Sequence, residues 1–234
     1  VSYNSLRKTE QSNLWVGMAK EAAHQLGTPL SGLYGWIAVL KELHKDEETQ
    51  NIVKELENDA ERLQSIASRF NKIGSLPELE YCEISPILNE IIAYMKRRLP
   101  QLGKHVKLHT DIGINVKIPL NPELFKWAIE NLVKNAMDAI NKTQKETFVS
   151  LKAQRIENDL IIDIEDSGIG IEKKYHKDVF KPGYSTKKRG WGLGLSLTRR
   201  IIEEYHKGDI CVLKSTPAEG TTIRITLPIK QDLN

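Results

Sequence analysis

The chain has few of the residues that mark several common classes of protein. Its 234 residues include two cysteines, Cys82 and Cys211, which lie far apart, so neither a disulfide framework nor a cysteine metal site is expected. Aromatic residues make up 6% and the net charge is +3, which does not favour a nucleic-acid partner. No apolar run is as long as a membrane span, and nothing resembles a signal peptide. We expect a cytoplasmic globular chain. The start at Val1 without methionine indicates a fragment, and no membrane contact is expected within it.

Proline and strand-forming patterns are scarce in the first 74 residues. Apolar residues recur every three or four positions from Leu14 to Leu40 and again from Ile52 to Ile73, which predicts two long helices. A polar break at 44–48 separates them, with Asp46 as an N-cap. The sequence therefore predicts an antiparallel α-helical hairpin, which we assign to a domain at 1–76.

Each of the two helices carries an apolar stripe, and a lone pair of helices makes a thin core. Two hairpins packed as a dimeric four-helix bundle bury more of both stripes, so the pattern favours a homodimer. The alternative is that the hairpin packs on the second domain of its own chain.

Beyond Pro77 strands and helices alternate, which indicates a second domain at 77–234. Ser85-Pro86 and Asn121-Pro122 predict helix starts, and a further helix is expected at 195–206. Strands are expected at 106–112, 116–120, 148–156, 160–165, 210–214 and 221–228. This order indicates an α+β sandwich with helices on one face of a mixed sheet.

Three polar residues share one face of the helix after Pro122. Asn131, Asn135 and Asp138 are spaced i, i+4 and i+7, and the apolar residues lie mainly on the other side. Such amides and carboxylates can supply oxygen ligands to a magnesium ion that also contacts phosphates. A solvated polar face has the same spacing, so this pattern alone does not identify a site.

Two glycine clusters strengthen the prediction of a nucleotide site. Asp166-Ser167-Gly168-Ile169-Gly170 follows a predicted strand, where a carboxylate can accept a hydrogen bond from an amino group such as that of adenine. Gly190-Trp191-Gly192-Leu193-Gly194-Leu195 precedes a predicted helix, whose N-terminal N–H groups can bind phosphate. The basic segment 180–189 between them is typical of a lid whose cations approach phosphates.

A histidine lies in the first predicted helix, in Ala23-His24-Gln25-Leu26-Gly27-Thr28-Pro29-Leu30. The nearest stripe residues are two positions away, about 200° around the helix, so His24 is expected to face outward. Thr28 shares its face, and Pro29 is expected to kink or loosen the helix. An outward histidine in a chain with a nucleotide site is a candidate phosphoryl acceptor.

From His24 to Pro228 the chain resembles the catalytic core of a two-component sensor histidine kinase. That core joins a dimerisation and phosphoacceptor hairpin to an ATP-binding domain of the GHKL or Bergerat fold. The N-box, first glycine box, F-box, second glycine box and glycine-threonine element of the family resemble residues 131–139, 166–171, 180–187, 190–195 and 219–222. The resemblance implies the cytoplasmic part of a longer sensor protein that a membrane segment could anchor.

The resemblance also implies roles for individual residues. His24 would take the γ-phosphoryl group of ATP and pass it to an aspartate of a response regulator acting in trans, as a protein histidine kinase does. Asn135 would hold Mg²⁺, and Asp166 would bind the adenine amino group. The other residues of the implied ATP site are Asn131, Asp138, Gly168, Gly170, Lys187, Gly192, Gly194, Leu195 and Thr222.

Gln25 departs from the family pattern, in which the residue after the histidine is often acidic and orients or accepts the imidazole proton. A carboxamide can orient the ring but accepts no proton at neutral pH. Three interpretations stay open: solvent or ATP takes the proton, Glu21 substitutes one turn earlier, or the kinase is weak. Thr28 matches a position that in related kinases places water for dephosphorylation of the regulator.

Two other functions compete with the kinase. ATPases of the same fold carry a glutamate four residues before the magnesium-binding asparagine, where this chain has Asn131. Glu130 is adjacent but about 100° around the helix, which disfavours hydrolysis to free phosphate. The second competitor is a catalytically weak nucleotide-binding scaffold, which only Gln25 favours.

Overall fold

The structure is a computed structural model of the chain, and it describes residues 3–73, 77–98, 106–140, 147–187 and 192–229. The chain divides into two compact units, Val1–Pro77 and Glu78–Asn234. Within the described ranges, none of the helices combines the length and the apolar character required to cross a membrane.

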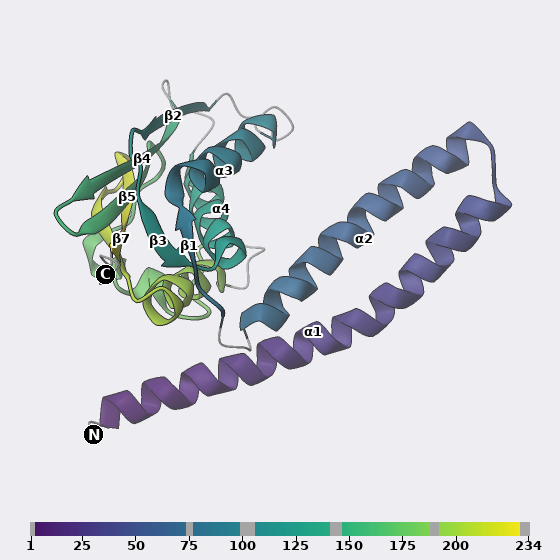
Figure 1. Ribbon diagram of the computed structural model, residues 1–234, viewed down its shortest axis with the longest axis horizontal. Helices are drawn as coiled ribbons and strands as arrows, with labels where there is room; N and C mark the ends of the chain where they lie inside the picture. Colours follow the sequence, from purple (N-terminus) through teal and green to yellow (C-terminus); the bar gives the residue numbers. More distant parts are fainter. Residues whose placement is uncertain (1–2, 74–76, 99–105, 141–146, 188–191, 230–234) are drawn as a thin grey trace. The chain divides into compact units, whose positions relative to one another are not determined.

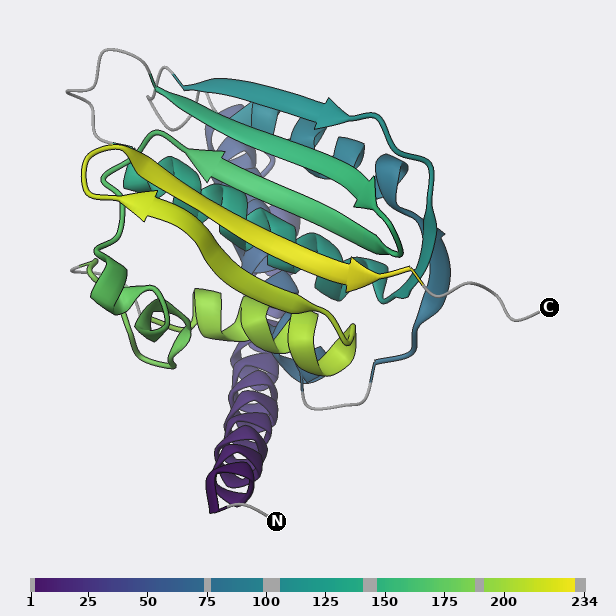
Figure 2. The same ribbon diagram turned by 90° about the vertical axis from the view of Figure 1, so that its left-hand side faces the viewer.

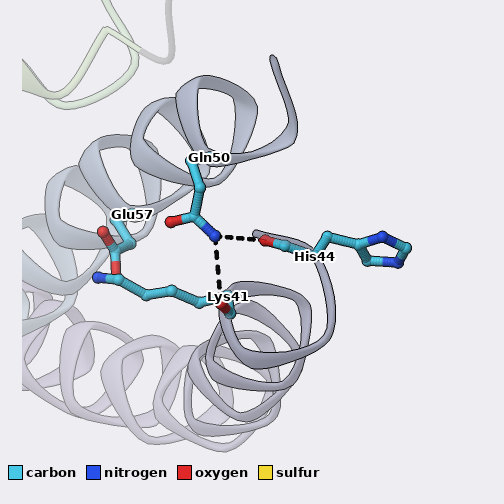
Figure 3. Close-up of polar contacts among 4 residues, drawn as sticks. All are labelled: Lys41, His44, Gln50 and Glu57. Carbon is cyan, nitrogen blue, oxygen red and sulfur yellow. Dashed lines mark hydrogen bonds and ion pairs between the residues drawn. The ribbon is translucent and has the colours of Figure 1, made fainter. Parts of the chain in front are cut away.

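The first unit is the expected antiparallel helical hairpin. Helix α1 spans Tyr3–Leu43 and α2 spans Glu47–Ile73 (Figure 1). Asp46 caps α2, because its Oδ1 accepts a hydrogen bond from the Thr49 N–H over 2.8 Å. Gln50 donates from Nε2 to the carbonyl oxygens of Lys41 and His44 (Figure 3). These bonds satisfy carbonyl groups at the end of α1 that have no partner within the helix, and so they close the turn.

The apolar stripes of the hairpin are only partly buried within one chain. Leu30, Ile37, Val53, Ala60 and Ala67 are buried. Other members of the stripes, and apolar residues beside them, remain exposed: Leu26, Trp36, Val39, Leu43, Ile52, Leu56 and Leu63. The side chains of Leu14, Met18, Ala22, Phe70 and Ile73 fall outside the described ones. Packing within a single hairpin thus buries only part of the predicted stripes, and it leaves apolar side chains exposed on the described helices.

The second unit is built on a mixed five-stranded sheet. Its strands are β2 (Lys107–Ile112), β4 (Phe148–Ile156), β5 (Asp159–Asp166), β7 (Gly220–Pro228) and β6 (Asp209–Thr216), in that spatial order. β2 pairs with β4 in parallel, and the other neighbours are antiparallel. A separate pair joins β1 (Glu80–Glu83) to β3 (Lys117–Leu120). The predicted mixed sheet is confirmed; β1 was not predicted.

Helices α3 (Ile84–Arg98), α4 (Pro122–Ala139) and α5 (Gly194–Arg200) lie on one face of this sheet (Figure 2). Alternate residues of β5 and β7, such as Leu160, Ile162 and Ile225, are buried against them. The helix predicted at 195–206 begins one residue earlier and changes at Ile201 to a π-helical turn, Ile201–Tyr205. Two short 3-10 turns, Lys173–Tyr175 and Asp178–Phe180, precede it.

A buried histidine ties the π-helical turn to the start of α4. His206 is 5% exposed, and its Nε2 accepts the Asn121 N–H over 2.9 Å. Its Nδ1 therefore carries the proton, which it donates to the Ile201 carbonyl oxygen over 2.7 Å. Burial lowers the pKa of His206, so the ring is neutral near pH 7 and both bonds persist. The far end of the α5 segment is thereby held against α4.

Candidate functional site

Helix α4 presents the three polar residues as the sequence predicts. Asn121 caps the helix by accepting the Leu124 N–H over 3.1 Å, and Pro122 occupies the first turn. Asn131 and Asn135 are half-buried and Asp138 is exposed. The buried face consists of Leu124, Phe125, Ala128, Ile129, Leu132, Val133, Ala136 and Met137. Burial of that face on the sheet directs the three polar side chains to the other side.

A lysine from a distant segment reaches two of these polar residues. Lys187 Nζ lies 2.7 Å from Asp138 Oδ2 and 3.2 Å from Asn135 Oδ1. The ammonium thus sits between an amide oxygen and a carboxylate oxygen that are one turn apart on α4. Both partners of the ion pair are partly exposed, so its contribution to stability is small. The geometry shows that these two oxygens can hold a cation between them.

Asp166 ends β5 and is only 6% exposed. Its Oδ1 accepts the Gly168 N–H over 2.8 Å. Burial raises the pKa of Asp166 to about 6, against the opposing effect of hydrogen bonds from the Gly168 and Thr221 backbones. The carboxyl group is therefore mostly ionised at pH 7.5, where it is a buried acceptor suited to an amino group.

The glycines after Asp166 allow main chains to approach closely. A Cβ on Gly168 would lie 2.6 Å from the Ala139 carbonyl oxygen, which accepts the neighbouring Ile169 N–H. Gly170 has a φ of +70°, and a Cβ there would lie 1.9 Å from the Thr216 carbonyl oxygen. These contacts join the segment after β5 to the end of α4 and to β6. Both predicted glycines are therefore required by the backbone.

The second glycine cluster leads directly into α5. Gly192 has a φ of +65° and its carbonyl oxygen accepts the Gly183 N–H over 3.0 Å. Gly194 begins α5, and Leu195 packs at the edge of the main core. Gly190 and Trp191, which belong to the predicted motif, lie outside the described residues.

Asn131 connects this cluster to α4. Its Nδ2 donates to Thr198 Oγ1 over 2.8 Å, and Thr198 is 1% exposed. Sequence reasoning missed Thr198, because a single threonine within a helix has no pattern that marks its partner.

Thr222 does not join the other predicted ATP-site residues. In the sheet register Asp166 pairs with Thr221, whereas Thr222 pairs with the exposed Glu165. Because successive residues of a strand point to opposite faces, Thr222 lies on the face away from Asp166. Thr221 is buried and its hydroxyl lies 2.9 Å from the Ser215 hydroxyl, so it is the threonine beside Asp166.

On the hairpin, His24 and Thr28 are both exposed, as the helical phase predicts. Helix α1 continues through Pro29, and Ser31 Oγ donates to the Gly27 carbonyl oxygen over 3.0 Å in this region. Gln25 Nε2 donates to Glu21 Oε1 over 2.7 Å. The glutamate and the glutamine around the histidine are thus linked to each other.

The described residues form an α+β sandwich of the GHKL fold and a helical hairpin with an exposed histidine. Residues 16–76 match the family model of the His Kinase A (phospho-acceptor) domain. Residues 121–231 match the family of Histidine kinase-, DNA gyrase B-, and HSP90-like ATPases, so the second unit is an ATP-binding domain. The chain therefore belongs to the two-component sensor histidine kinases, and it spans their catalytic core.

Similar proteins support this assignment. Sporulation kinase D of Bacillus subtilis is 30% identical over 91% of this chain and 41% of its own length. Sensory histidine kinase/phosphatase NtrB of Salmonella typhimurium is 28% identical over 92% of this chain and 62% of its own. The chain thus spans less than two thirds of these relatives. Histidine kinase ThkA in complex with response regulator protein TrrA has a similar fold, with a TM-score of 0.59, 22% identity and coverage of 99% of this chain and 67% of that one.

Proposed function

We propose that the protein phosphorylates itself on His24 with ATP and then transfers the phosphoryl group to an aspartate of a response regulator. One observation carries the proposal above the others. An exposed histidine lies on a hairpin that matches the phosphoacceptor family, and the second unit matches the ATP-binding family and carries the buried carboxylate Asp166. Relatives named as histidine kinases, and the solved kinase–regulator complex of similar fold, support both steps.

In this proposal, Asp166 accepts a hydrogen bond from the adenine amino group, and the backbone at Gly192 and Gly194 faces the phosphates. Asn135 supplies an oxygen ligand to Mg²⁺, and Asp138 supports it. The Lys187 ammonium already lies between these two oxygens, so the residues present fit a cation there. Mg²⁺ supplies neutralisation of charge on the phosphate oxygens. Displaced from Asp138, the Lys187 ammonium could pair with a phosphate instead.

The chemical step needs a neutral imidazole nitrogen on His24. That nitrogen attacks the γ-phosphorus, a nitrogen–phosphorus bond forms, the bond to the bridging oxygen breaks and ADP leaves. We propose that solvent or ATP takes the imidazole proton. In support, the side-chain NH2 group of Gln25 donates a hydrogen bond to Glu21. The side-chain oxygen of Gln25 is therefore the atom that can orient the imidazole N–H.

Incubation with γ-labelled ATP and Mg²⁺ tests the proposal against its two competitors. A kinase gives acid-labile, alkali-stable label on the protein, and chelation of the metal prevents it. Free phosphate without labelled protein would instead indicate an ATPase of the same fold. Nucleotide binding with neither product would indicate a scaffold.

We also propose that the protein is a homodimer through the hairpin. The exposed residues Ile52, Leu56 and Leu63 repeat at spacings of four and seven along α2, which is the pattern of a helix-packing face. A second hairpin would cover this face and complete a four-helix bundle.

Glutamate at two of these positions should separate the protomers. We expect Leu56→Glu combined with Leu63→Glu to raise the dimer dissociation constant by more than about 100-fold, because each buried leucine contributes about 1.5–3 kcal/mol. Sedimentation equilibrium measures the constant. Lys54→Glu, at an exposed polar position of the same helix, is the control and should leave it unchanged. A double variant that still sediments as a tight dimer would place the interface elsewhere.

We further propose that the protein dephosphorylates its phosphorylated regulator with the help of Thr28. This residue is exposed one turn from His24, where its hydroxyl can orient a water molecule, and the relative NtrB is named a kinase/phosphatase. We expect Thr28→Ala to slow regulator dephosphorylation by about tenfold, the effect of one lost hydrogen bond. Labelling of His24 should persist, and Thr28→Ser should retain both activities. An equal loss of both activities in Thr28→Ala would contradict this role.

A further inference from the structure

A partly buried hydrogen bond links α5 to α4 next to the glycine cluster. Asn131 Nδ2 donates to Thr198 Oγ1 over 2.8 Å, across 67 residues of sequence. Thr198 is buried almost completely, so both groups would lose hydrogen bonding if the helices shifted apart. The pair therefore favours one alignment of the two helices.

The other end of the same carboxamide touches the glycine cluster. A Cβ on Gly194 would lie 2.6 Å from Asn131 Oδ1 and 3.1 Å from Nδ2, so the Gly194 backbone rests on the Asn131 side chain. Thr198 lies one helical turn beyond Gly194 in α5. One asparagine side chain thus contacts Gly194 while Thr198 holds its orientation.

The opposite end of this helical segment has its own anchor. His206 accepts the Asn121 N–H and donates to the Ile201 carbonyl oxygen, so the π-helical turn stays on α4 without help from Thr198. Loss of the Thr198 hydroxyl should therefore release chiefly the end of the segment that begins at Gly194.

We propose that Thr198 is a positioning residue for the phosphate-binding backbone. Acting through Asn131, it sets the position of residues 192–194 against which the phosphates of the nucleotide lie. This inference rests on the proposed function. It adds a residue that, among the described residues, forms no hydrogen bond with Asp166, the carboxylate proposed to bind adenine. Its effect should therefore grow with the number of phosphates on the ligand.

The test compares ATP with adenosine in Thr198→Val, which keeps the side-chain shape and removes the hydroxyl. The dissociation constants of ATP and adenosine are measured by their competition with a fluorescent nucleotide for the parent chain and for the variant. We expect the affinity for ATP to fall about fivefold, as for the loss of one neutral hydrogen bond, and the affinity for adenosine to change less than twofold. Thr198→Ser, which keeps the hydroxyl, should restore the parent affinity for ATP.

A core variant separates positioning from a general loss of stability. Ile92→Val removes a buried methyl group from α3, far in sequence from the Asn131–Thr198 pair. It should lower the melting temperature yet leave the ratio of ATP to adenosine affinity unchanged. Equal losses for ATP and adenosine in Thr198→Val, or no loss for either, would overturn the inference. A parent chain that binds neither ligand would instead overturn the proposed function.

Discussion

Replacement of His24 by glutamine is expected to abolish labelling of the protein by γ-labelled ATP. Glutamine keeps a polar side chain of similar size at an exposed position, so the fold should be unchanged. It has no nitrogen with a lone pair able to attack phosphorus, so the phosphoryl group has no acceptor at this position. The effect is measured by labelling the protein without exposure to acid. Mass spectrometry then assigns the phosphorylated residue.

His44→Gln is the matched control for this variant. His44 is also exposed on the hairpin, but it contributes to the turn through its backbone carbonyl, which glutamine retains. Labelling should persist at the parent level in His44→Gln. Affinity for ATP should persist in both variants, because the nucleotide site belongs to the other compact unit. Undiminished label in His24→Gln would show that another residue is the acceptor.

Replacement of Asp166 by asparagine is expected to weaken binding of ATP and of adenosine by at least about tenfold. In the proposed function the buried carboxylate is a charged acceptor for the adenine amino group, and hydrogen bonds to charged groups contribute about 1.5–3 kcal/mol. Both ligands should be affected equally, because both contain adenine. Isothermal titration at pH 7.5 measures the two affinities. This shared loss contrasts with the phosphate-dependent loss expected for Thr198→Val.

The same carboxyl group should make the affinity of the parent for adenosine depend on pH, and Asp166→Asn should lack this dependence. The pKa of Asp166 is raised from 3.8 to about 6, so the group gains a proton as the pH falls from 7.5 towards 5. The protonated form is a weaker acceptor, so the affinity of the parent for adenosine should fall over this range. Asp166→Asn should show no such fall. An equal decline in parent and variant would assign the titration to another group.

The contribution of Asp166 to folding stability changes with pH in the direction opposite to the affinity for adenosine. Because the pKa of Asp166 is higher in the folded state, the folded protein binds this proton more tightly than the unfolded chain between about pH 4 and 6. The contribution of Asp166 to stability is therefore present at low pH and is lost as the pH rises through 6. The ionised form of Asp166, which we propose to recognise adenine, thus has a cost in folding free energy at neutral pH.

The sequence by itself determined the elements and the motifs of this protein, because local physical chemistry specifies both. Apolar spacings of three and four gave the hairpin helices, and the phase of that stripe placed His24 outward. Segments rich in strand-forming residues predicted the strands of the mixed sheet. Strand β1 was not predicted, because its four residues form a strand only through pairing with β3.

Only the tertiary structure decided which side chains meet, since those contacts join residues distant in sequence. The bond from Asn131 to Thr198 and the approach of Lys187 to Asp138 depend on how helices and loops pack on the sheet. The strand register decided that Thr221, rather than Thr222, lies beside Asp166, because a shift of one residue reverses the face of a strand. Packing and register are properties of the whole domain, whereas periodicity and motif spacing are properties of each segment.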